Sequence, residues 1–143
     1  MKSFLLFIAL LCAVVLSNSW APTVTNAANT EKKERATMNF DRPVQLLGAT
    51  LKGEYLFVHD DQAMARGDAC SFVYKGSAEI QGNLVVSFHC TPALRNKVSH
   101  FTVRTFLTEP GKYALREFQF AGSSEAHLVP VSEHAHINIA PLE

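Results

Sequence analysis

The sequence has few cysteines, no excess of charge of either sign and no regular helical pattern. Of its 143 residues, three are cysteines, and 13 basic residues balance 13 acidic ones. A chain without net charge has no electrostatic footprint for nucleic acid or for an anionic membrane. Glycine-rich loops that cradle phosphate are absent as well. We therefore expect no nucleic-acid partner, and the sequence does not name another.

Long apolar sequence is confined to the first residues. Lys2 precedes an apolar run from Phe4 to Leu16, which is shorter than the about 20 residues that span a bilayer. A positive start, a short apolar run and small residues after it are typical of a secretory signal peptide. We predict a signal peptide over residues 1–21, with cleavage between residues 19 and 28, and no transmembrane anchor after its removal. The protein would then be exported, to the periplasm or the extracellular space.

The segment after the predicted leader is polar. Residues 22–37 include the stretch TNAANTEKKERAT, which mixes charges of both signs and is typical of a solvated linker. The rest, residues 38–143, has the commonest size of a single domain. We predict one β-domain over this range.

The domain reads as strands. Five runs are rich in β-branched and aromatic residues and are separated by turn signals: 54–59, 70–75, 84–90, 101–107 and 113–120. Three shorter candidates have prolines in or beside them, as edge strands do: 42–48, 127–131 and 136–140. One short helix is expected within Asp60–Gly67, with Asp60 or Asp61 as its N-cap. We predict an all-β fold, a single small antiparallel β-sandwich of seven or eight strands, with an open barrel as the alternative.

Two cysteines remain after leader removal, because Cys12 lies in the apolar run. Side chains alternate along a strand, so His89 and Cys90 point to opposite faces and do not form a metal site or a nucleophile–base pair together. A hairpin folded about Ile80 places Cys70 opposite Cys90, at a distance suited to a disulfide. The same register predicts two further pairs of core residues: Phe72 with Phe88, and Tyr74 with Val86. We predict one Cys70–Cys90 disulfide, which would stabilise the fold by about 3 kcal/mol.

Histidines gather near the C-terminus. His134 and His136 point to one face of an extended strand, and His127 supplies a third imidazole if the chain turns between them. Three imidazoles suit copper or zinc. The alternative is that these are solvated surface histidines without a ligand.

A second group of titratable residues lies at a predicted strand end. His59 is followed by Asp60 and Asp61, and an imidazole with two carboxylates can perform acid–base chemistry. The two aspartates also suit a helix cap and a turn, which is the favoured interpretation. We assign no catalytic residues, and an enzyme is the least favoured class.

The stretch FDRPVQLLGATLKGEYLFV, Phe40–Val58, resembles the opening of small exported bacterial β-rich proteins of uncharacterised function. These share F-D-x-P-V, a glycine and an L-x-x-G-x-Y hairpin. The resemblance implies an envelope or extracellular β-domain and carries no catalytic residues.

Two functions remain open. The first is an exported, non-catalytic β-domain with a structural or binding role in the cell envelope or outside the cell, which needs no cofactor. The second is a periplasmic or extracellular copper- or zinc-binding protein that uses the histidine cluster of His127, His134 and His136.

Overall fold

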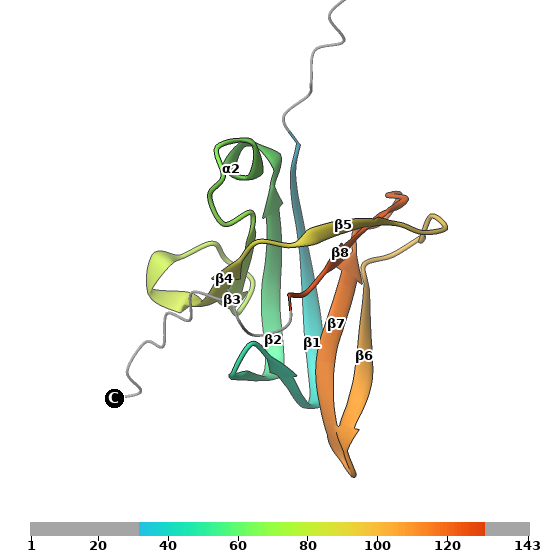
Figure 1. The fold of residues 1–143 in the computed structure, drawn as a ribbon. Helices are drawn as coiled ribbons and strands as arrows, with labels where there is room; N and C mark the ends of the chain where they lie inside the picture. The colour runs from blue at the N-terminus through green and yellow to red at the C-terminus, as the bar shows by residue number, and fades with distance from the viewer. Residues whose placement is uncertain (1–31, 131–143) are drawn as a thin grey trace, which may run out of the picture.

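A computed structural model describes residues 32–130 of the chain, which fold into eight strands, one short α-helix and one 3-10 turn (Figure 1). The elements follow in this order: β1 Lys33–Leu46, β2 Ala49–Asp60, α2 Asp61–Ala65, β3 Ser71–Lys75, η1 Gln81–Asn83, β4 Leu84–Phe88, β5 Thr91–Leu94, β6 Thr102–Glu109, β7 Lys112–Gln119 and β8 Glu125–Leu128. The predicted all-β fold is confirmed.

All eight strands belong to one sheet, in the order β4-β3-β2-β1-β7-β8-β5, with β6 paired to β7. The sheet is mixed, because β1 and β7 pair in parallel through Val44 with Tyr113 and Gln45 with Ala114. Residues 32–130 therefore form one mixed sheet instead of the two packed antiparallel sheets of the predicted sandwich.

The connection between β4 and β5 explains the shape of the sheet. These strands lie at opposite ends of the strand order, yet only His89 and Cys90 separate them in the sequence. So short a link requires the sheet to curl until its two ends approach each other. Figure 1 shows the chain crossing from β4 over the middle of the sheet to join β8 as β5. The curled sheet is nearer to the alternative expectation, an open barrel.

Most predicted strands are present. The five main runs correspond to β2, β3, β4, β6 and β7, and residues 42–48 and 127–131 contribute to β1 and β8. The candidate at 136–140 lies outside the described residues. Strand β5 was not predicted, because Pro92 and exposed neighbours interrupt the alternation that marks a strand.

Strand β1 begins inside the predicted linker. Residues 33–37 pair with the end of β2, and every second side chain from Ala36 to Phe40 turns toward the main core. Lys33 and Arg35, which come before them, are exposed, and both bind the Glu79 carboxylate. The stretch was predicted to be a linker because it is mostly polar, although its inward-facing and outward-facing side chains alternate as in a strand.

The predicted register between β3 and β4 is wrong by one residue. The observed pairs are Ser71–Phe88, Phe72–Ser87 and Val73–Val86, followed by Tyr74–Leu84 after a bulge. The bulge and the η1 turn change the length of the connection, which the prediction treated as a simple hairpin. Phe72 and Tyr74 consequently pack on the opposite face of the sheet from Phe88, in a small second cluster. Ser87, predicted to be the more exposed side, is buried.

The short helix is as predicted. Asp60 is the N-cap of α2, and its carboxylate accepts hydrogen bonds from the backbone N–H groups of Gln62 and Ala63. Gly67 follows the helix with a φ of +79°, a conformation that glycine adopts readily. The structural interpretation of Asp60 is therefore confirmed.

The main core fills the inside of the curl. Its largest fully buried rings are Phe57, Phe88 and Phe118, with centroid separations of 5.4 Å from Phe57 to Phe118 and 6.3 Å from Phe88 to Phe118. Phe118 also stacks on the imidazole of His127, at 5.0 Å and an interplanar angle of 25°. The main core is therefore bordered, next to Phe118, by the polar side chain of His127.

Candidate metal centre

Two histidines and two cysteines meet where the ends of the sheet approach each other. His59 comes from the end of β2, and His127 comes from the middle of β8. Cys70 directly precedes β3, and Cys90 lies in the short link between β4 and β5. Because β5 pairs with β8, with Thr91 opposite Leu128, the link carries Cys90 to His127. The curl of the sheet thus assembles this cluster.

The potential ligand atoms are close together. The Sγ atom of Cys90 lies 3.4 Å from Nδ1 of His127 and 3.4 Å from Sγ of Cys70. Ligand atoms of His59, Cys90 and His127 all lie within 4.8 Å of one another. The two imidazole rings are 4.1 Å apart between centroids, with an angle of 35° between their planes. One ion can therefore contact all three residues.

All four side chains are buried. The exposed fraction is 0% for His127 and Cys70, 1% for His59 and 9% for Cys90. Burial of a polar group is costly unless it has a partner, at about 1–3 kcal/mol for each unsatisfied donor or acceptor. Water cannot readily supply that partner at a site so enclosed.

Three of the four imidazole nitrogens lack hydrogen-bond partners, and the fourth, His127 Nδ1, contacts the sulfur of Cys90. Within residues 32–130, five buried side-chain nitrogen or oxygen atoms have none, and three of them are His59 Nδ1, His59 Nε2 and His127 Nε2. A fourth, Ser71 Oγ, belongs to the residue next to Cys70. Unsatisfied polar atoms are rare in native structures and call for an explanation where they gather. The described part of the chain concentrates them at this cluster.

Carboxylates lie just outside the two imidazoles. Nδ1 of His59 is 3.2 Å from Asp61 Oδ1, without the alignment of a hydrogen bond, and Nε2 of His127 is 4.0 Å from Glu34 Oε2. Metal-bound histidines commonly have a carboxylate beside the nitrogen that does not bind the ion. The other nitrogen of His59, Nε2, is available to the cluster. The other nitrogen of His127, Nδ1, faces Cys90 and also lies 3.9 Å from Glu125 Oε1.

The electrostatics of the cluster favour a neutral His127. Burial, together with the neighbouring His59, lowers the pKa of His127 to about 4. For His59, burial lowers the pKa, but the Cys70 sulfur and the carboxylate of Asp61 raise it more, so the net shift is upward. His127 therefore presents a lone pair at neutral pH, as a metal ligand must.

The pKa values of the two thiols are shifted in opposite directions. A hydrogen bond from Cys90, opposed by burial and aided by His59, lowers the pKa of Cys70 to about 3. The same contact with Cys70, together with burial, raises the pKa of Cys90. Of the two adjacent sulfurs, that of Cys70 therefore ionises first.

The distances suit a soft or borderline ion. Tetrahedral zinc, with bonds of about 2.3 Å to sulfur and about 2.0–2.1 Å to nitrogen, places neighbouring sulfur and nitrogen ligands about 3.5 Å apart. The Cys90–His127 separation of 3.4 Å is close to this value. Sulfur and imidazole ligands are also those that copper(I) accepts.

The sequence analysis named His127, His134 and His136 as a candidate metal site. His127 lies in the cluster, whereas His134 and His136 fall outside the described residues. The predicted Cys70–Cys90 disulfide is not formed: both residues are free thiols, with sulfurs 3.4 Å apart instead of the about 2.05 Å of a bond. Their side chains nevertheless meet, although the register that predicted this was wrong.

The sequence analysis missed His59 as a partner of His127. The signal was present in β2, where Tyr55, Phe57 and His59 alternate along one strand face. Tyr55 and Phe57 belong to the main core, so the same alternation places His59 inside it. The place of His59 in the core is thus explained without an acid–base role together with Asp61.

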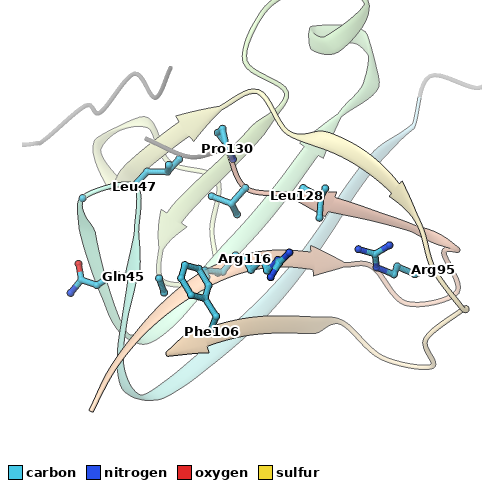
Figure 2. A pocket seen from close by; sticks show the side chains of 11 residues that line it. Gln45, Leu47, Arg95, Phe106, Arg116, Leu128 and Pro130 are labelled. Atoms are coloured by element: carbon cyan, nitrogen blue, oxygen red, sulfur yellow. The ribbon is translucent and has the colours of Figure 1, made fainter. Parts of the chain in front are cut away.

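A separate surface pocket of about 530 Å³ lies beside β7. Figure 2 shows Leu47, Leu128 and Pro130 on one side of it and Phe106 on the other, with Arg95 at one end. None of the four cluster residues lines it. The pocket and the buried cluster are therefore distinct.

Within the described residues, no helix is long and apolar enough to cross a membrane. The chain matches none of the protein-family models, curated proteins or solved structures with which it was compared. The function of the site is therefore argued below from the residues of this chain alone.

Proposed function

We propose that this protein is an exported β-domain that binds a transition-metal ion, zinc or copper(I), through His59, Cys90 and His127. One observation carries the proposal. Three buried side chains from distant parts of the chain bring ligand atoms within 4.8 Å of one another, and three of their four imidazole nitrogens have no hydrogen-bond partner among the described residues.

A metal ion accounts for what hydrogen bonding leaves unexplained. Three unsatisfied imidazole nitrogens would cost about 1–3 kcal/mol each, a large part of the stability of a domain this size. Histidines buried for packing alone normally donate or accept at both ring nitrogens. An ion bound between the rings uses one nitrogen of each, and the carboxylates of Asp61 and Glu34 approach the other.

The residues suit zinc and copper(I) for different reasons. Zinc accepts imidazole and thiolate ligands, which His59, His127 and Cys90 supply. Copper(I) prefers soft ligands, which the sulfur of Cys90 supplies. Both ions are therefore used in the test below.

Export is part of the proposal. It is supported by the predicted signal peptide in residues 1–21 and by the resemblance of Phe40–Val58 to exported bacterial β-rich proteins. An exported metal-binding domain could store its ion or deliver it to a partner.

A second candidate function needs no metal. In an oxidising compartment, Cys70 and Cys90 would form the predicted disulfide and the protein would be a structural or partner-binding β-domain. The contact between the two sulfurs favours this candidate. The two candidates make opposite predictions about metal binding by the reduced protein.

Metal titration of reduced, untagged protein tests the proposal. Zinc or copper(I) is added against a chromophoric chelator of known affinity, with folding checked by circular dichroism. We expect one saturable site. His59→Asn, Cys90→Ser and His127→Asn should each weaken it more than about 100-fold, because even outer-shell changes at metal sites weaken binding about 10- to 100-fold.

Two sets of variants serve as controls. His89→Asn and His100→Asn alter exposed histidines and should leave the affinity unchanged. The double change His134→Ala with His136→Ala should also leave it unchanged. Loss of the site in that double variant, with binding kept in His59→Asn, would instead support the C-terminal histidine cluster predicted from the sequence.

A further inference from the structure

We propose that Cys70 is a redox switch for this metal centre: a disulfide between Cys70 and Cys90 removes the sulfur ligand and releases the ion. The inference rests on the proposed metal binding by His59, Cys90 and His127. It adds a regulated state that metal binding alone does not require.

Cys90 stands between two competing partners. Its sulfur is 3.4 Å from Nδ1 of His127, on the metal side, and 3.4 Å from the sulfur of Cys70 on the other. The backbone N–H of Cys90 also points at Cys70 Sγ, at 3.4 Å. A disulfide needs the two sulfurs to approach to about 2.05 Å, so they have to move about 1.4 Å closer than they are in the reduced protein.

The two partners exclude each other chemically. A metal ion binds a cysteine as its thiolate, so Cys90 has to give up its proton when the ion binds. A sulfur in a disulfide has no such charge to donate. Cys70 is not one of the three residues whose ligand atoms lie within 4.8 Å of one another, so its sulfur is the one available for redox chemistry.

The oxidant can be a low-molecular-weight disulfide. One cysteine thiolate attacks it, forming a mixed disulfide and releasing one thiol of the oxidant. The second cysteine then attacks the first, closes the Cys70–Cys90 bond and releases the second thiol. Two cysteine thiols lose two protons and two electrons, and the oxidant takes them up as two thiols. The freed ion leaves to solvent.

Linkage makes the switch measurable. A metal that binds only the reduced protein stabilises that form by mass action. With free zinc held 100-fold above its dissociation constant, the midpoint potential of the cysteine pair should rise by about 60 mV, since a tenfold change corresponds to 29.6 mV for this two-electron couple.

The test uses reduced protein in glutathione buffers of graded potential, with free zinc fixed by a chelator. Disulfide formation is read by mass spectrometry after alkylation, and bound zinc by a colorimetric chelator after desalting. We expect the oxidised protein to bind zinc more than about 100-fold more weakly than the reduced protein, in keeping with the loss of a direct ligand. Treatment with a reducing agent should restore the affinity.

Cys70→Ser is the matched control, because it keeps Cys90 and cannot close the bond. It should retain zinc in oxidised glutathione, where the unaltered protein loses it. Cys70→Ala provides a second form of the same control if the serine variant folds poorly.

The outcomes separate the switch from the metal site. Zinc bound equally well by oxidised and reduced protein, or two thiols that persist in oxidised glutathione, would overturn the switch and leave the metal site standing. A disulfide that closes in a protein whose reduced form binds neither zinc nor copper(I) would overturn the proposed function as well.

Discussion

Two buried polar clusters lie on the same pair of neighbouring strands, and they differ in how their atoms are satisfied. On β7, the buried carboxylate of Glu117 accepts hydrogen bonds from Arg95 and Arg104. On β8, the imidazole of His127 meets His59 and Cys90 but leaves Nε2 without a partner. The first cluster is complete within the protein, and the second is not.

The difference indicates what each cluster is for. Glu117 is only 3% exposed, and its two arginines supply the charge and the donors that a buried carboxylate requires. The histidine cluster is as deeply buried, yet within the described part of the chain three of its four imidazole nitrogens have no hydrogen-bond partner. A stable fold can hold such groups if a ligand completes them, which is why we assign the ion to this cluster.

The largest effect is expected from a substitution at Phe118, which packs both in the core and against the histidine cluster. Phe118→Ala removes a ring that stacks on His127 and packs against Phe57 and Phe88. We expect a loss of about 3–5 kcal/mol in the free energy of unfolding, measured by urea denaturation. Phe106→Ala, at a ring that is 46% exposed, is the control and should cost far less. Equal costs at the two sites would mean that the core is misplaced.

A smaller effect is expected from a substitution in the cluster of Glu117, Arg95 and Arg104. Glu117→Gln removes the charge that Arg95 and Arg104 bind, and should lower the free energy of unfolding by about 1.5–3 kcal/mol at neutral pH. Zinc affinity should stay unchanged, because Glu117 is not a ligand. A variant that loses zinc binding as well as stability would show that the two clusters are not separate.

The same substitution predicts a pH dependence. Burial raises the pKa of Glu117, but the hydrogen bonds and charges of Arg95 and Arg104 lower it more, so the folded-state pKa lies below the usual value. Its stabilisation is therefore complete above the unfolded pKa of about 4.3 and is lost as the pH falls through the lower folded pKa. The difference between the unaltered protein and Glu117→Gln should narrow below about pH 4. A difference that grew in acid would contradict the direction of this shift.

The smallest effect comes from an exposed version of the same arrangement. Glu79 binds Lys33 and Arg35 at the surface, where its side chain is 31% exposed. Glu79→Gln should change the free energy of unfolding by less than about 1 kcal/mol, as exposed ion pairs do. Lys33 and Arg35 lie in the stretch that was expected to be a linker. A larger cost would show that their ion pairs with Glu79 anchor β1.

Local patterns predicted the strands well and the long-range assembly poorly. Alternation identified β2, β3 and β4, and capping rules identified α2 with Asp60. The register between β3 and β4 was missed because a bulge follows Val73, and a bulge leaves no clear mark in the sequence.

The cluster could be predicted only in fragments. The burial of His59 was readable from Tyr55 and Phe57 on the same strand face. Its meeting with His127 was not, because it depends on the curl imposed by the link through His89 and Cys90. Contacts made by closing a sheet depend on strand order, which side-chain periodicity does not encode.

X-ray absorption spectroscopy of the reduced, zinc-loaded, untagged protein tests the central claim most directly. We predict two imidazole nitrogens at about 2.0–2.1 Å and at least one sulfur at about 2.3 Å from the zinc. Cys90→Ser, if it still holds zinc at the concentrations used, should lose one sulfur from that shell. A shell of nitrogen and oxygen alone, with no sulfur in the unaltered protein, would contradict a site built on Cys90.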